Sequence, residues 1–201
     1  MTSTLLVIGE DAPCCAFGER LVRQFLPRWH TPLPSIDTRG VTKLRSALPR
    51  YCEQANFVQP VLCIADTDGQ CPVSMLTDWL PNGAPPRLVL RLAVKEAESW
   101  ALADAAEFAA AYEVPVSKIP LRPEDAADAK SAVLTLAKRS RSRKIRDEVV
   151  SAGSPPRPGA GYNLHLCRFI SQRWRPEEAM TRSPSLLRAV MRLQLLASTQ
   201  N

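Results

Sequence analysis

The sequence predicts an α/β fold, a mostly parallel Rossmann-like sheet flanked by helices, followed by a C-terminal helical extension. Two observations support this prediction. Short apolar runs alternate with helical patterns from residue 4 to residue 112, and such alternation is typical of βαβ units. The runs are apolar at consecutive positions, as expected for parallel strands that are buried on both faces.

Four strands are expected, at residues 4–8, 33–40, 60–66 and 88–94. Four helices alternate with them, over residues 17–26, 41–55, 71–80 and 96–112. Pro49 should kink or split the second helix, because proline lacks an amide hydrogen and its ring crowds the preceding turn. Pro72 suits the first turn of the third helix, whose Val73, Leu76 and Leu80 should face the core.

The last third of the chain differs in kind. It contains a basic helical stretch, a Pro/Gly/Ser-rich linker and two closing helices, at residues 130–150, 151–161, 162–174 and 183–196. Ser183 is the expected N-cap of the last helix, and Pro184 its first residue. We therefore expect an α/β body at residues 1–120 and a basic helical extension at residues 121–201, packed on that body.

The net charge of +6 is unevenly distributed along the chain. Residues 1–120 hold 11 Lys and Arg against 13 Asp and Glu, whereas residues 121–201 hold 15 against 7. A basic segment on a nearly neutral body favours a polyanionic partner such as nucleic acid, although a basic soluble surface is the alternative. The densest positive cluster consists of Lys138, Arg139, Arg141, Arg143, Lys144 and Arg146. It suits a nucleic-acid backbone, or equally an acidic protein.

The cysteines and histidines do not form a recognisable metal motif. None of the six cysteines forms a CxxC pair, and the chain has only two histidines, which argues against a structural zinc site. We expect reduced thiols in a cytoplasmic protein, since no secretory leader is evident. No apolar stretch approaches the about 18 to 20 residues that span a bilayer, so no membrane association is expected.

Acidic residues follow two of the predicted strands. Glu10 comes after the first strand, and Asp66 and Asp68 come at the end of the strand at 60–66. Carboxyl ends of parallel strands lie at the same edge of a sheet, and residues i and i+2 of extended chain point the same way. Three converging carboxylates would repel one another unless a hard cation such as Mg²⁺ or Mn²⁺ bound them. The alternative is ordinary turn chemistry, since Asp and Gly often end strands.

Gly9-Glu10 and Asp66-Thr67-Asp68 resemble the motifs of the TOPRIM fold, shared by topoisomerases, DnaG-type primases and overcoming-lysogenization-defect nucleases. "LAVKEAESWALAD", Asp128-Ala129-Lys130, "GYNLHLCRF" and "SPSLLRA" are similar to stretches of an uncharacterised TOPRIM-like branch found in bacterial anti-phage defence loci. The resemblance implies a metal-dependent nuclease with Glu10, Asp66 and Asp68 as catalytic metal ligands. The Gly-x-Thr-Glu element of the family is absent, and Asp11 or Glu19 is its candidate replacement.

Three further residues are candidates for the same site. Glu96 and Glu98 follow the next strand and could hold a second ion or orient a water, although Glu98 also suits the first turn of a helix. Lys130 could meet a scissile phosphate, or be a solvated helix lysine. Tyr162 follows the flexible "PGAG" and could reach the same edge of the sheet. Glu98 and Lys130 are thus predicted catalytic residues, and both glutamates predicted metal ligands.

Two classes of function remain open from the sequence. The first is a nuclease acting on DNA or RNA, tRNA included, which the resemblance implies to be a toxin-like effector of anti-phage defence held by a partner ATPase of the ABC or AAA type. The second is a non-catalytic adaptor or regulatory subunit of such an ATPase complex. Homo-oligomerisation is compatible with either.

Overall fold

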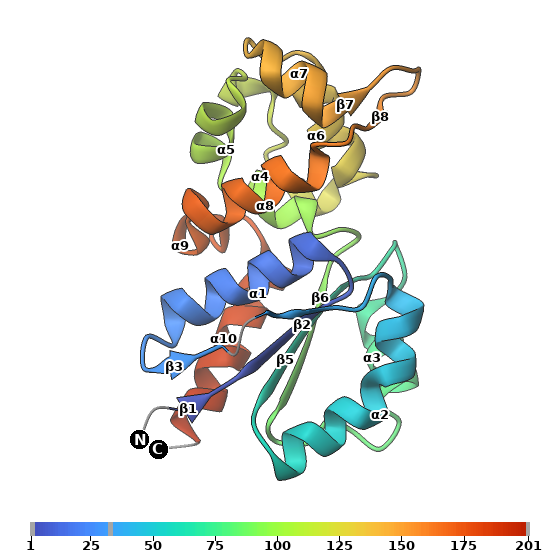
Figure 1. Cartoon of the computed structure of the whole chain (residues 1–201), viewed down its shortest axis with the longest axis vertical. Helices are drawn as coiled ribbons and strands as arrows, with labels where there is room; N and C mark the ends of the chain where they lie inside the picture. The colour runs from blue at the N-terminus through green and yellow to red at the C-terminus, as the bar shows by residue number, and fades with distance from the viewer. Residues whose placement is uncertain (1–2, 32–33, 200–201) are drawn as a thin grey trace.

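The computed structural model describes residues 3–31 and 34–199 and contains a central parallel sheet (Figure 1). The sheet has the strand order β4, β2, β5, β6, and every neighbouring pair is parallel. Its strands are β4 (Ile36–Asp37), β2 (Leu6–Gly9), β5 (Val61–Asp66) and β6 (Leu88–Ala93). The predicted α/β class with a mostly parallel sheet is therefore confirmed. The predicted strand at 33–40 is reduced to two residues, and Leu33 lies outside the described residues.

Helices cover both faces of this sheet (Figure 1). One face packs against α1 (Ala12–Phe25) and α10 (Pro184–Ser198), the other against α2 (Val41–Phe57) and α3 (Pro72–Trp79). Each face of the sheet has its own hydrophobic core, and alternate residues of β5 belong to each. Leu62 and Ile64 pack on the α1 side, and Cys63 packs on the α2 side. This is the period-two division of side chains that a strand buried on both faces requires.

The strand predicted at residues 4–8 is divided in two. The amide of Leu5 donates to the carbonyl of His30 at 2.9 Å, whereas the amide of Leu6 donates to the carbonyl of Pro60 at 2.9 Å. The chain thus changes pairing partner at this point. Its first part, β1 (Ser3–Thr4), pairs with β3 (Trp29–His30), and β2 joins the main sheet.

A helical part lies beyond the carboxyl ends of the strands and is drawn above the sheet in Figure 1. It contains α4 (Glu98–Ala103), α5 (Ala105–Tyr112), η1 (Val116–Lys118), η2 (Pro123–Asp125), α6 (Ala129–Lys138), α7 (Arg143–Val149), β7 (Val150–Ser151), β8 (Arg157–Pro158), α8 (Tyr162–Gln172) and α9 (Pro176–Ala179). Phe17 of α1 packs edge-on against Trp100 and Trp174, with ring centroids 5.5 and 4.7 Å apart. These aromatic contacts connect the sheet to the helical part.

The local predictions had mixed outcomes. Of the two effects predicted for Pro49, splitting of the helix is excluded, since α2 continues from Val41 to Phe57. Val73 is 72% exposed, and Met75 of α3 is buried in its place. The predicted helix at 96–112 is interrupted at Asp104, whose side chain caps α5 and also accepts two hydrogen bonds from the Arg175 guanidinium at 2.6 and 3.0 Å. The cap is a local interaction with the amide of Glu107, and the ion pair with Arg175 adds a tertiary contact at the same residue.

The basic stretch at 130–150 also forms two helices instead of one. α6 ends at Lys138, and Ser142 begins α7 by accepting a hydrogen bond from the amide of Ile145. Ser183 and Pro184 begin α10 as predicted, with the Ser183 hydroxyl accepting from the amide of Leu186. N-caps are local interactions, so the sequence alone can indicate them.

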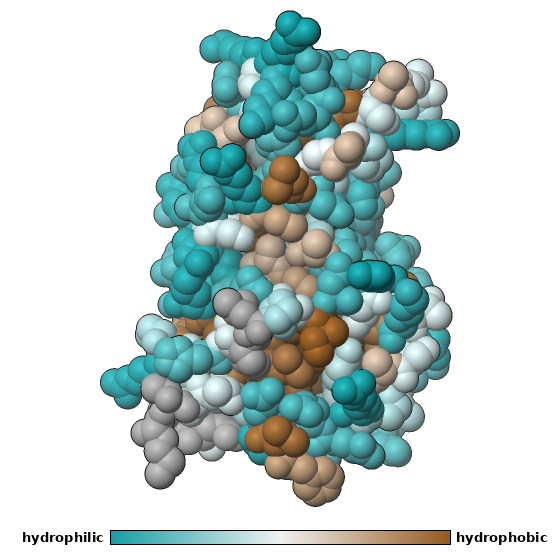
Figure 2. Space-filling model, in the orientation of Figure 1, coloured by the Kyte–Doolittle hydropathy of each residue, from teal (hydrophilic) through white to brown (hydrophobic). Residues whose placement is uncertain are grey.

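The outer surface differs between the two parts of the molecule. Figure 2 shows mainly hydrophilic side chains over the helical part, while apolar side chains gather lower on the same face. In residues 3–31 and 34–199, no helix is both long and apolar enough to cross a membrane.

We predict that Gly18→Ala lowers the free energy of unfolding by about 1 to 3 kcal/mol, although alanine normally stabilises helix interiors relative to glycine. A Cβ at this position would lie 2.5 Å from Cγ1 of Val7, because α1 packs tightly on β2. Urea unfolding measures the change. In a Val7→Ala background the same substitution should cost less, and equal costs in both backgrounds would contradict the assigned contact.

Candidate active site

Glu10 and Asp66 meet at the carboxyl ends of the two central strands. β2 and β5 are neighbours with Gly9 opposite Ile64, so both chains leave the sheet at the same edge. The Asp66 amide donates to Oε2 of Glu10 at 3.1 Å. Oδ1 of Asp66 in turn accepts a hydrogen bond from the amide of Ala97 at 2.8 Å, which fixes the carboxylate beside the start of α4.

Gly9 allows this arrangement because the first turn of α1 comes very close to it. A Cβ at Gly9 would lie 2.5 Å from the amide nitrogen of Cys15 and 2.7 Å from the carbonyl oxygen of Asp11. Asp11 caps α1 by accepting from the amide of Cys14 at 2.9 Å. Glu19 accepts from the hydroxyl of Ser35 at 2.6 Å. Both candidate replacements for the missing family element are therefore engaged locally.

Asp66 and Asp68 do not share one extended conformation. Asp66 is 8% exposed, whereas Asp68 is exposed and has a positive φ of 47°. The Asp68 amide donates to the carbonyl of Lys95 at 2.9 Å, and the Lys95 amide donates to Oγ1 of Thr67 at 2.7 Å. The expectation that both aspartates point the same way as residues of extended chain is therefore wrong. Lys95 also has a positive φ, of 60°, which the sequence does not indicate.

Glu98 is held in the interior by two partners from the C-terminal third of the chain. Its side chain is 4% exposed, and its Oε1 accepts from the hydroxyl of Tyr162 at 2.8 Å. The Lys130 ammonium lies 3.7 Å from the same oxygen and 5.6 Å from the centre of the Tyr162 ring. Lys130 is therefore paired with Glu98 rather than freely solvated.

Glu96 forms a hydrogen bond that fixes the start of α6. Its Oε2 accepts from the amide of Lys130 at 2.8 Å, at the first turn of α6. Asp128 caps the same helix by accepting from the amide of Ser131 at 2.5 Å. Glu96 and Asp128 thus fix α6 at the end that carries Lys130. Asp68, Glu96 and Asp128 line a shared cavity of about 270 Å³.

Two glycines of "PGAG" explain how Tyr162 reaches Glu98. A Cβ at Gly159 would lie 2.5 Å from the carbonyl oxygen of Glu148, and one at Gly161 would lie 2.9 Å from Glu148 Cβ. The Gly161 amide donates to that same carbonyl at 2.9 Å. The stretch predicted to be a linker is therefore packed against the end of α7. This packing positions Tyr162, the first residue of α8.

Burial leaves the central carboxylates unusually basic. Burial raises the pKa of Asp66 to about 9, and the negative charges of Glu10 and Glu98 add to the effect. Burial likewise raises the pKa of Glu10 to about 7, against the opposing hydrogen bond from the Asp66 amide. Burial disfavours the charge on Lys130, but Glu98 and Asp11 outweigh it, so the pKa of Lys130 lies above its ordinary value. Near neutral pH, without a bound cation, Asp66 therefore keeps its proton and Glu10 is only partly ionised.

The oxygen-rich site has donors of the kind that hard divalent cations prefer. Oε1 of Glu10, Oδ2 of Asp66 and Oε2 of Glu98 make no hydrogen bond to any residue in the described ranges. However, the described part of the chain has no group of three or more His, Cys, Asp or Glu side chains placed to hold a metal ion. The donor chemistry fits Mg²⁺ or Mn²⁺, and the carboxylates would have to draw closer to share one.

The predicted basic cluster begins at the far end of the helix that carries Lys130. Lys138 lies eight residues along α6, which corresponds to about 12 Å of helix. Arg146 donates to the carbonyls of Ser140 and Arg141, and Arg143 pairs with Asp147. The other members are exposed and make no ion pair with a described residue; they are Lys138, Arg139, Arg141 and Lys144.

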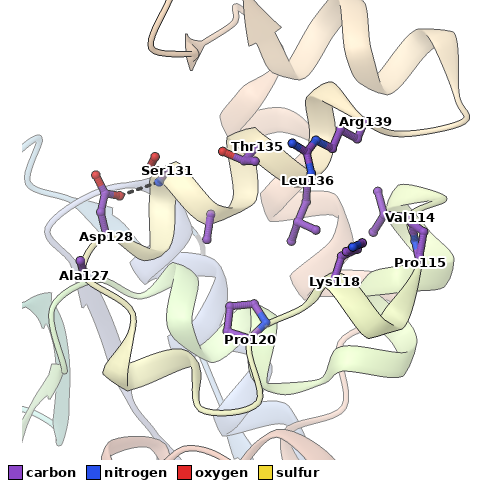
Figure 3. A pocket seen from close by; sticks show the side chains of 11 residues that line it. Val114, Pro115, Lys118, Pro120, Ala127, Asp128, Ser131, Thr135, Leu136 and Arg139 are labelled. Carbon is purple, nitrogen blue, oxygen red and sulfur yellow. Dashed lines mark hydrogen bonds between the residues drawn. The ribbon is translucent and has the colours of Figure 1, made fainter.

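A larger cavity of about 510 Å³ lies on α6 away from the central carboxylates (Figure 3). Leu136 of α6 and Arg139, which follows that helix, line one side, and Lys118 and Pro120 lie on the facing segment. Its lining is mainly apolar. This cavity contains neither Glu10 nor Asp66, so it is separate from the central carboxylates.

Comparisons with known proteins give no relative for this chain. No family model, no curated protein and no solved structure matches it.

We predict that Asp66→Asn flattens the pH dependence of stability. Its folded-state pKa of about 9 lies above the unfolded value, so the folded chain binds the proton more tightly. Stability contributed by that proton is complete below the unfolded pKa and is lost as the pH rises to about 9. One such group contributes at most about 1.4 kcal/mol per pH unit.

Urea unfolding from about pH 5 to about pH 9 measures this slope in wild type and variant. The wild type should lose stability relative to Asp66→Asn as the pH rises. Glu53→Gln, which removes an exposed carboxylate on α2, should keep the wild-type slope. Parallel curves for wild type and Asp66→Asn would contradict the buried environment assigned to Asp66.

Proposed function

We propose that this chain is a divalent-metal-dependent nuclease with a TOPRIM-like centre that hydrolyses phosphodiester bonds of DNA or RNA. The observation that carries the proposal is the contact between Glu10 and Asp66 across neighbouring strands. These are the residues that the sequence resemblance assigns to the centre. Glu98 and Lys130 come to the same edge of the sheet from other segments, as the proposed function requires.

Glu10, Asp66 and Asp68 would hold the cation, with Glu98 and Glu96 beside them. When bound, Mg²⁺ or Mn²⁺ would offset the carboxylate charge, polarise the phosphodiester and make a water more acidic. Hydrogen bonds within the protein orient the carboxylates. The amide of Ala97 holds Asp66, and the Tyr162 hydroxyl holds Glu98, so neither carboxylate rotates freely. Lys130 supplies a cation that a substrate phosphate could share with Glu98.

The basic cluster at 138–146 is the proposed contact to the nucleic-acid backbone. Apart from Arg146 it is exposed, and it begins at Lys138, the last residue of the helix that bears Lys130. A role as a toxin-like effector of anti-phage defence, controlled by a partner ATPase, belongs to the proposal through the sequence resemblance alone.

A non-catalytic adaptor or regulatory subunit of such an ATPase complex is the second candidate. Two observations favour it: the described carboxylates are not arranged as a three-ligand metal site, and Asp11 is used as a helix cap. In that case the acidic edge of the sheet would be a binding surface only.

We predict that the purified chain with Mn²⁺ cleaves total tRNA, plasmid DNA or single-stranded DNA. Asp66→Asn and Glu10→Gln should each lower the rate at least about 100-fold, the scale of losing charge stabilisation at a reacting group. Gel analysis of the three substrates measures this, and Glu53→Gln should cleave like the wild type.

Thermal unfolding in the same preparations separates the two candidates. Mn²⁺ should raise the melting temperature of the wild type but not of Glu10→Gln. A metal-dependent shift without cleavage would favour the adaptor. Cleavage that survives in both carboxylate variants would overturn the proposed centre.

We predict that Arg141→Glu with Lys144→Glu weakens nucleic-acid binding at every sequence tested. Loss of two phosphate contacts should reduce the slope of log affinity against log salt by about 2. Fluorescence anisotropy over a salt series measures it. Arg50→Glu, an exposed arginine on α2, is the matched control. Unchanged affinity and slope would exclude this cluster from the interface.

A further inference from the structure

The outer edge of the sheet at β6 has unpaired backbone groups. β6 is the last strand of the sheet and pairs only with β5 among the described residues. The carbonyls of Arg87 and Ala93 accept from β5, so the alternate residues Leu90 and Leu92 direct their polar backbone groups away from it. Neither amide donates to a described residue outside the sheet. Such an edge is a template for another strand.

A groove follows this edge. It has a volume of about 330 Å³ and is bordered by Leu76 of α3 on one side and Arg192 of α10 on the other. Leu90 and Arg91 of β6 and Gly83 also line it. A side-chain-lined channel over an unpaired strand is the geometry that extended peptides use when they add to a sheet.

The α10 side of the groove carries uncompensated positive charge. Arg91, Arg188 and Arg192 form no ion pair with any residue that the structure describes. Burial lowers the pKa of Arg91, and the charges of Arg192 and Arg188 lower it further. Neither residues 79–94 nor residues 184–198 contain an Asp or Glu. The protein itself therefore offers this cluster no neutralising partner nearby in sequence.

An apolar stripe continues the surface across α10. Leu187, Met191 and Leu195 are 41%, 60% and 49% exposed and recur every four residues, so they lie along one side of the helix. Arg188 and Arg192 follow two of them directly. The exposed face of α10 thus combines large apolar side chains with the arginines of the groove.

We infer that the β6 edge and α10 form a docking site for an extended segment of a partner protein in which acidic and apolar residues alternate. Added beside β6, such a segment would satisfy the backbone groups of Leu90 and Leu92. Its side chains would alternate between the two sides of the sheet. Carboxylates would face Arg91 and Arg192, and apolar side chains would face Leu76 of α3.

Charge selects this occupant over two others. A second copy of the chain paired edge to edge would bring two sets of Arg91, Arg188 and Arg192 together, which like-charge repulsion disfavours. A nucleic-acid backbone would gain nothing from Leu187, Met191 and Leu195. An acidic protein segment uses both the arginines and the apolar surface. This inference does not depend on the proposed nuclease activity.

Selection from a displayed library of random peptides of about ten residues, against the full chain, tests the inference. The recovered peptides should carry acids at alternate positions. Their affinity should fall at least about tenfold for Arg188→Glu with Arg192→Glu, two substitutions on the surface of α10. Lysine versions of the same peptides should bind that variant better than the wild type. Arg50→Glu should behave like the wild type, and circular dichroism verifies folding of each variant.

Only alternate residues of an added strand donate to β6, so two peptides are compared, with proline at one or the other of two adjacent central positions, and one of the two should lose binding. Several results would overturn the inference. They are recovery of no peptide, recovered peptides without alternating acids, equal affinity for the charge-reversed chain, and unaffected binding of both proline peptides. Self-association by light scattering that the charge reversal abolishes would assign the face to a second copy instead.

Discussion

Two carboxyl groups buried where β2 and β5 end are the constraint on which the functional interpretation depends. Adjacent parallel strands bring Glu10 and Asp66 into contact, and burial makes both reluctant to ionise. A fold gains no stability from such an arrangement. The surroundings nevertheless hold it in place, with the amide of Ala97 on Asp66 and with Lys130 near Glu98. Structure maintained against its own electrostatic cost is typical of sites that bind or transform a ligand.

The helical part of the chain contributes side chains at the same edge of the sheet. Lys130 of α6 and Tyr162 of α8 both reach the carboxylate of Glu98 in α4. Edge-on packing of Phe17 with Trp100 and Trp174 ties these helices to the sheet. The main hydrophobic core accordingly includes residues from both parts, from Leu5 to Leu196. Residues far apart in sequence therefore share one rigid framework around the acidic edge.

Features set by neighbouring residues were predictable from the sequence, and features set by distant ones were not. The buried strands and the Ser183 cap follow from local patterns. The ion pair of Asp104 with Arg175, 71 residues away, has no local signal. The positive φ of Lys95, whose amide donates to Oγ1 of Thr67, has none either. Sequence spacing can bring carboxylates to one edge, but it does not fix the direction of each side chain.

The basic character of residues 121–201 is not a single surface for polyanions. Arg175 is bound to Asp104, Arg173 to Glu107, and Arg182 donates to the carbonyls of Pro120 and Leu121. These arginines hold the fold together. Cations without an ion pair to a described residue gather in two places, the cluster at 138–146 and the α10 edge, and Arg157 and Arg168 also form none. Only the second adjoins exposed apolar side chains and an open strand. The net charge therefore overstates the surface available to nucleic acid. Part of the positive excess pairs with other groups of the protein, and part lies beside apolar side chains that suit a protein partner.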